Sequence, residues 1–170
     1  MKSFFNILQR AFFLVMLVFT QFVVSYVFPF PFSATHVPTV IIVVYLFLQE
    51  KRHIVWYMFG LFFLLEILVP SPIFGDMLVP GVLSAFVAYW CYRFLFTNQS
   101  LYTAMLLGTI TLLSYRFLTA AYVVMFDILS KKGILVLPSW SLQVFGIEFL
   151  MTEFGLFIII FFLLKRKKTF

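Results

Sequence analysis

Four ionisable side chains lie inside otherwise apolar stretches of this sequence: Glu66, Arg116, Glu148 and Glu153. Charged groups in a long apolar run are energetically expensive, so they usually pair with one another or serve a function. Since one of the four is a base and three are acids, the sequence predicts at least one ion pair within the hydrophobic part of the protein.

The depth of each charge along its predicted helix indicates which of them can meet. At 1.5 Å of rise per residue, Arg116 lies roughly 16 Å from the loop that joins the last two apolar runs. On the other side of that loop, Glu148 lies roughly 10 Å and Glu153 roughly 18 Å away. Glu66 lies only about 6 Å from the turn that follows it. We therefore expect Arg116 to pair with Glu153 or Glu148, either to lock two helices together or as part of a proton or substrate pathway.

No catalytic or cofactor motif accompanies these charges. The sequence contains no HExxH, GxSxG or P-loop pattern. Its two histidines, His36 and His53, fall in different predicted loops on opposite sides of a membrane, so they should not share a metal ion. The single cysteine, Cys91, excludes an internal disulfide and a zinc site built on cysteines. We expect a protein that is not an enzyme and binds neither cofactor nor metal.

The composition indicates an integral membrane protein. Of its 170 residues, 64% are hydrophobic and only 11% are charged, whereas a soluble domain carries about 25% charged residues. The apolar runs are continuous rather than alternating, which predicts helices and not a barrel. The expected fold is a single all-α domain over residues 1–170, a polytopic helical bundle in the membrane.

Polar and proline-containing breaks divide the chain into six predicted spans. The first, 11–28, is long and ends in bulky residues, so a retained helix is favoured over a cleaved signal peptide. The second is short and follows a loop at 30–39, so whether it crosses completely stays open. The predicted spans are 11–28, 40–48, 54–69, 77–96, 101–126 and 142–164, and the longest polar connection is 127–141.

The basic residues predict the orientation of the spans. The net charge is +6, but the positive charges cluster at predicted helix ends, where they set topology and contact phospholipid. A nucleic-acid partner is therefore not expected. Lys131 and Lys132 lie on one side, and the opposite side holds Lys2, Arg10, Lys51, Arg52, Arg93, Lys165, Arg166, Lys167 and Lys168. By the positive-inside rule both termini are predicted to be cytoplasmic.

Small residues form one face of the fourth predicted span. Gly81, Ser84, Ala85 and Ala88 follow the spacing i, i+3, i+4 and i+7, which lets another helix approach closely. Packing within the bundle is one reading of this face, and docking of a partner's single transmembrane helix is the other.

The turn between the third and fourth spans is predicted to face outward. It is short, stiffened by proline and nearly uncharged. An acid at the end of the preceding helix is expected either to cap this turn or to contact a partner protein. The residues concerned are Glu66, Pro70, Pro72, Gly75 and Asp76.

Over about residues 38–107 the order of these features resembles the rod-shape-determining protein MreD family. The pattern is a proline opening the second helix, a basic turn, a glycine-bearing helix ending in an acid, a turn with a small residue, proline and glycine, and a helix ending in an aromatic and a basic residue. Here it comprises Pro38, Lys51-Arg52, Gly60 to Glu66, Ser71 to Gly75, and Tyr89 with Arg93. The resemblance implies a non-enzymatic scaffold of the bacterial inner membrane that works in lateral wall synthesis with MreC, MreB, RodA and a transpeptidase.

A transporter part is the alternative reading. The substrate-binding subunit of an energy-coupling-factor vitamin transporter also has six helices in a chain of similar length. Such subunits tend to carry small-xxx-small docking in the first helix, which the stretch 11–20 lacks. They also need a polar, outward-facing pocket, and the sequence offers few polar residues for one.

Overall fold

The computed structural model describes residues 2–49, 53–69, 73–96, 100–130 and 142–167, and within these ranges the protein is helical without strands. The described residues form six α-helices, which confirms the all-α prediction and the expected number of helices. They are α1 (Lys2–Val27), the 3-10 turn η1 (Phe32–Ala34), α2 (Val37–Gln49), α3 (Ile54–Leu68), α4 (Leu78–Phe94), α5 (Leu101–Ser130) and α6 (Leu142–Lys167).

Two helices are long and apolar enough to cross a membrane, judged by length and composition. These stretches are Leu101–Ile128 in α5 and Gln143–Lys165 in α6. The remaining apolar helical stretches have 10–17 residues, fewer than the roughly 20 that a straight crossing of the hydrocarbon core requires. The prediction that the polar connection begins at Asp127 is wrong, because α5 continues to Ser130. Its apolar positions extend to Ile128, so the helix does not end at the first charge.

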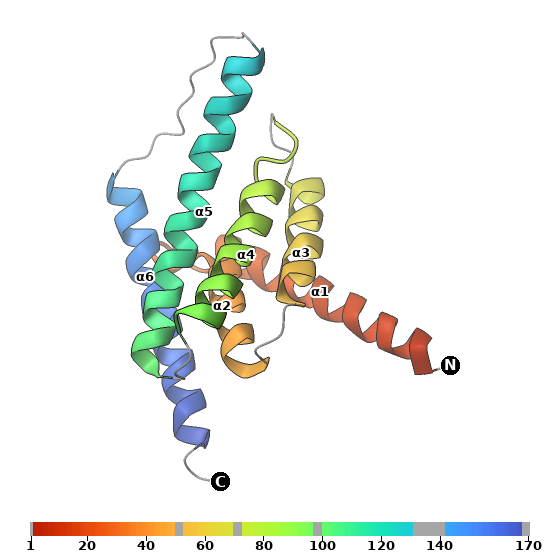
Figure 1. Ribbon diagram of the computed structural model, residues 1–170, viewed down its shortest axis with the longest axis vertical. Helices are drawn as coiled ribbons and strands as arrows, with labels where there is room; N and C mark the ends of the chain where they lie inside the picture. The colour runs from red at the N-terminus through yellow and green to blue at the C-terminus, as the bar shows by residue number, and fades with distance from the viewer. Residues whose placement is uncertain (1, 50–52, 70–72, 97–99, 131–141, 168–170) are drawn as a thin grey trace.

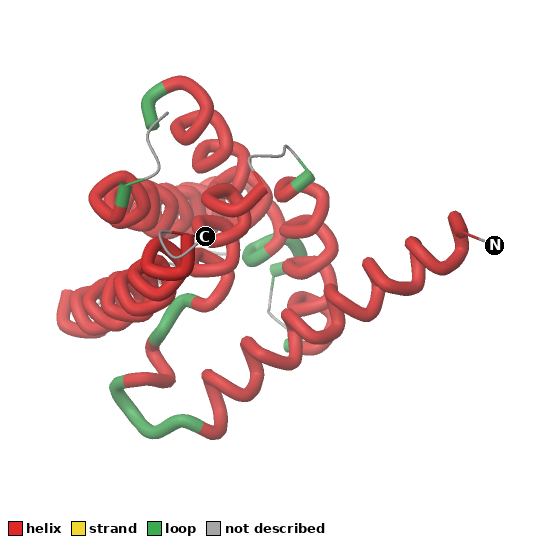
Figure 2. The backbone as a smooth tube through the Cα atoms, turned by 90° about the horizontal axis from the view of Figure 1, so that it is seen from below, coloured by secondary structure: helices red, strands yellow, loops and turns green. Residues whose placement is uncertain are grey.

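Helices α3, α4 and α5 lie side by side, and α6 packs against α5 (Figure 1). The short α2 contacts each of the other five α-helices. Helix α1 runs steeply across the others, and its N-terminal turns project away from the bundle in both views (Figures 1 and 2).

The small residues of α4 are covered by the chain's own helices. Gly81, Ser84, Ala85 and Ala88 are all buried, and α4 packs against both α3 and α5. A Cβ atom at Gly81 would come within 2.3 Å of the Phe62 ring on α3. This face therefore serves packing within the bundle and leaves no room for a partner helix.

Candidate functional site

The carboxylate of Glu66 ties the end of α3 to the start of α4. Glu66 is only 5% exposed, and its Oε1 accepts a hydrogen bond from the backbone N–H of Gly75. Its Oε2 accepts one from the N–H of Leu78 at 2.9 Å. Leu78 opens α4, where N–H groups lack a partner within the helix and a negative charge is favourable. Glu66 thus caps α4 from the neighbouring helix.

The turn that Glu66 holds requires glycine at position 75. Gly75 has a φ of +95°, a conformation that residues with a Cβ rarely adopt. Tyr122 of α5 donates a hydrogen bond to the carbonyl of Phe74 at 2.8 Å. Its hydroxyl would also lie 2.6 Å from a Cβ at position 75. Side chains from α3 and α5 therefore fix the turn from two sides.

These contacts assign the acid a capping role, one of the two roles expected for it. Glu66 and Gly75 are buried and Asp76 is partly buried, so Glu66 and Gly75 offer no surface to a partner. Pro70 and Pro72 lie outside the described residues. The exposed side chain of the described part of this turn is Phe74, at 68%. Sequence reasoning missed Phe74, although a bulky aromatic before a turn glycine was the signal available.

Arg116 of α5 forms a salt bridge with Glu148 of α6. The side chain of Glu148 is only 5% exposed, and that of Arg116 is 31% exposed. Glu148 is one of the two acids that the depth argument allowed, whereas Glu66 is committed to the α4 cap. The ion pair therefore joins the two longest apolar helices.

Glu153 takes a neutral partner instead. Its Oε1 accepts a hydrogen bond from the Thr109 hydroxyl at 3.1 Å, and Oε2 has no hydrogen-bond partner within the described ranges. The same Oε1 would lie 2.9 Å from a Cβ at Gly108. The missing side chain of Gly108 thus makes room for this acid between α5 and α6.

His36 lies in a loop, as the sequence predicted, and it is partly buried. Its contacts with α2, α5 and α6 were not predicted. Its Nδ1 accepts the backbone N–H of Thr39 at 3.3 Å and lies 2.7 Å from the Thr39 hydroxyl. The backbone N–H of His36 donates to the Thr152 hydroxyl of α6 at 2.9 Å. The side chain of His36 thus caps the start of α2.

This environment keeps the His36 ring neutral. Loss of hydration on burial, and secondly the charge of Arg116, lower the pKa of His36 to about 3. Since Nδ1 accepts from a backbone N–H, the proton of the neutral ring resides on Nε2. Protonation would remove the acceptor that caps α2.

An aromatic stack passes through the same region. The His36 ring lies 4.5 Å from that of Tyr115 on α5, and Tyr115 stacks on Phe62 of α3 at 5.8 Å. We call the group of His36, Thr39, Arg116, Glu148 and Thr152 the polar centre. With the stack, it links the start of α2 to α3, α5 and α6. Within it, His36 contacts Thr39 and Thr152, and Arg116 pairs with Glu148. These contacts suit the polar centre to fixing helices in place.

Only some of the basic residues predicted to set the membrane topology lie in the described part of the chain. Arg93 is exposed and donates to the Tyr89 hydroxyl at 3.0 Å, so the aromatic and basic residues that end α4 are in contact. Lys165 is exposed. Lys51, Arg52 and Lys168 lie outside the described residues, as do the side chains of Arg166 and Lys167. No cluster of metal-ligating side chains occurs in the part of the chain that the structure describes.

Comparisons with known protein families, with curated proteins and with solved structures find no match. The resemblance to the MreD family therefore stays a prediction from the sequence pattern.

Proposed function

We propose that this protein is a non-enzymatic scaffold of the MreD type, a multi-pass protein of the bacterial inner membrane that supports cell elongation and peptidoglycan synthesis. Both termini lie in the cytoplasm in this proposal. A single-span protein of the MreC type and other elongation proteins are its partners.

One observation carries the proposal: the acid and the glycine turn of the MreD-like pattern form a single hydrogen-bonded unit. Glu66 accepts the N–H groups of Gly75 and Leu78. At the other end of α4, the aromatic and basic residues of the pattern, Tyr89 and Arg93, are also bonded to each other. The spacing that produces the resemblance thus has a structural reason in this chain.

The surface of the bundle supports a membrane location. Large apolar side chains point outward on several helices, among them Trp56 at 73%, Phe117 at 72% and Phe162 at 64% exposure. Such a surface suits lipid, which offers no hydrogen bonds and favours helices. The lengths of α5 and α6 agree with this setting.

The internal polar groups favour a scaffold over a transporter. Arg116 is bound to Glu148, and Glu66 is bound to backbone N–H groups. These groups fasten helices to one another, which suits a scaffold better than a substrate pocket. In the scaffold, the exposed Phe74 of the outward turn is the partner contact, because aromatic side chains are frequent anchors at interfaces.

Complementation tests this function. In a rod-shaped bacterium depleted of its own MreD, we expect the wild-type chain to restore rod shape and to co-purify with an MreC-type protein. Phe74→Ala should reduce both without changing the amount of folded protein, and Gly146→Ala, on an open part of α6, should change neither. Recovery of a bound vitamin with no wall-synthesis partner would instead support the energy-coupling-factor alternative.

A further inference from the structure

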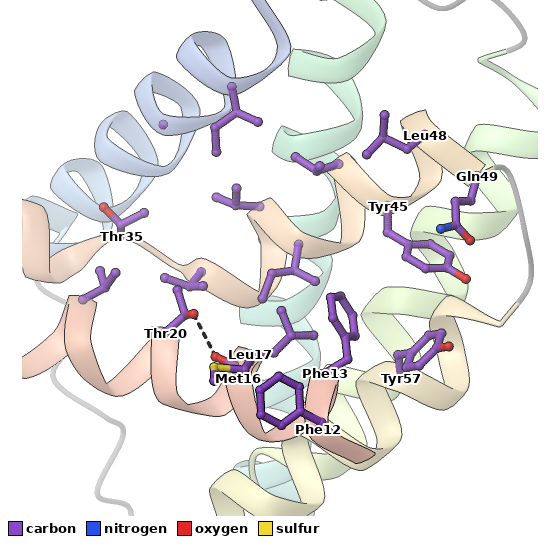
Figure 3. A pocket seen from close by; sticks show the side chains of 17 residues that line it. Phe12, Phe13, Met16, Leu17, Thr20, Thr35, Tyr45, Leu48, Gln49 and Tyr57 are labelled. Carbon is purple, nitrogen blue, oxygen red and sulfur yellow. Dashed lines mark hydrogen bonds between the residues drawn. The ribbon is translucent and has the colours of Figure 1, made fainter. Parts of the chain in front are cut away.

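An apolar groove with a volume of about 1060 Å³ is lined by residues of α1, α2 and α6. Figure 3 shows Phe12, Met16 and Leu17 of α1 on one wall and Leu48 of α2 on another. This volume is at the upper limit of the roughly 300–1,000 Å³ typical of small-molecule pockets. Its lining is mainly aliphatic and aromatic, so a ligand here must be largely hydrocarbon.

Glycine opens the groove on the α6 side. Gly155 lines it together with Ile159, and the nearest atom to a Cβ at Gly155 would be the Thr35 methyl group at 4.0 Å. A side chain at position 155 would therefore enter the groove without first meeting the protein. The absence of that side chain gives the groove its depth.

The length of the groove matches one leaflet of a bilayer. Helix α2 lines it from Val37 to Gln49, a distance of roughly 18 Å at 1.5 Å per residue. The hydrocarbon core of a bilayer is about 30 Å thick, so one leaflet contributes about 15 Å. An extended acyl chain of a membrane lipid spans this distance.

Polar groups gather at one end of the groove. Tyr45, Gln49 and Tyr57 lie together at the end of α2 and the start of α3 (Figure 3). The rings of Tyr45 and Tyr57 are 5.6 Å apart, and Phe13 lies 6.0 Å from Tyr57. Tyrosines with one apolar and one wet end are typical of the boundary between acyl chains and headgroups. The groove is thus amphipathic along its length.

We propose that this groove binds the acyl chain of a membrane phospholipid, with the headgroup at the end formed by Tyr45, Gln49 and Tyr57. The proposal requires the membrane location given above but none of the elongation partners. A flexible chain follows the irregular aromatic walls without moving α1.

Photolabelling tests this site. The full chain is reconstituted in bilayers with phosphatidylglycerol that carries a diazirine in its acyl chain, and the labelled positions are mapped by mass spectrometry. We expect label at groove residues such as Met16 and Val44 to exceed label at Phe117, which represents the ordinary lipid-facing surface. Gly155→Phe should lower the groove label about tenfold, the equivalent of 1.4 kcal/mol in binding. Gly146→Phe, on the same helix at an open position, should leave it unchanged.

A second variant covers the case in which Gly155→Phe does not fold. Thr20 of α1 lines the groove and is exposed, so Thr20→Trp fills the groove from the opposite wall and should lower the label in the same way. Groove label equal to that at Phe117, or unchanged by the filling variant that folds, would overturn the proposal. So would crosslinking of these positions to another protein's helix in native membranes. None of these results depends on rescue of cell shape, so the two proposals fail separately.

Discussion

The carboxylate of Glu66 accepts the backbone N–H of Gly75, nine residues further along the chain. Because the same side chain also accepts the N–H of Leu78, one acid closes the turn and caps the next helix. The turn is further held from α5 by Tyr122. The described part of the turn, residues 73–76, is therefore held from two sides and displays Phe74.

Replacing Glu66 with alanine should destabilise the protein by about 2 kcal/mol, because two N–H groups at a buried turn lose their acceptors. Glu66→Gln keeps one side-chain oxygen as acceptor and should cost less. Unfolding in mixed detergent micelles measures both changes. Equal stability of the alanine variant and the wild type would show that water replaces the carboxylate, contrary to the capping role.

The contact between Gly81 and Phe62 predicts a compensating pair of substitutions. Gly81→Ala places a methyl group where the Phe62 ring lies, and overpacking of this kind typically costs about 1–3 kcal/mol. Phe62→Leu in the same chain replaces the planar ring with a smaller side chain that lacks Cε2 and can turn away from the methyl group. It should recover part of that loss. A double-mutant cycle on unfolding free energies measures the coupling. Strictly additive effects would mean that the helices separate rather than clash.

Breaking the pair of Arg116 and Glu148 from one side should be costly. Arg116→Met leaves the buried acid without its cation, a change that costs about 3 kcal/mol in comparable buried pairs. Arg116→Met combined with Glu148→Leu removes both charges and should restore most of the stability. Folded yield and rescue of rod shape are the two measurements. If the double variant folds normally but no longer restores rod shape, the ion pair has a role beyond locking α5 to α6.

His36 predicts a pH dependence of stability with a definite sign. Its pKa is about 3 in the folded protein, compared with 6.5 for the free side chain. Between these values the unfolded chain binds a proton that the folded chain does not, so stability is lost as the pH falls below about 6.5. His36→Asn retains an acceptor for the N-cap of α2 but does not titrate. The variant should therefore lose less stability than the wild type between pH 7.5 and pH 5, and an identical loss would contradict this assignment.

The positions of the helices follow largely from the sequence. Apolar runs interrupted by polar and proline-containing segments placed α3 and α4 within two residues of their ends, because chain breaks are local signals. The distance of a charge along a helix is also a local quantity. Depth along the helices accordingly limits the partner of Arg116 to Glu148 or Glu153. The rotation of each helix about its axis then brings Glu148 to Arg116.

What only the tertiary structure decided is which side chains meet across helices. Sequence placed His36 in a loop, but its contacts with Thr152 and Tyr115 depend on how that loop returns to α5 and α6. The groove beside Gly155 likewise exists because α1 leaves the bundle at a steep inclination (Figure 1). For Glu66, the sequence allowed either capping or partner contact. The fold decided between them, because the N–H groups of Gly75 and Leu78 point at the carboxylate. Helix rotation and inclination are set by long-range packing, which local sequence patterns do not encode.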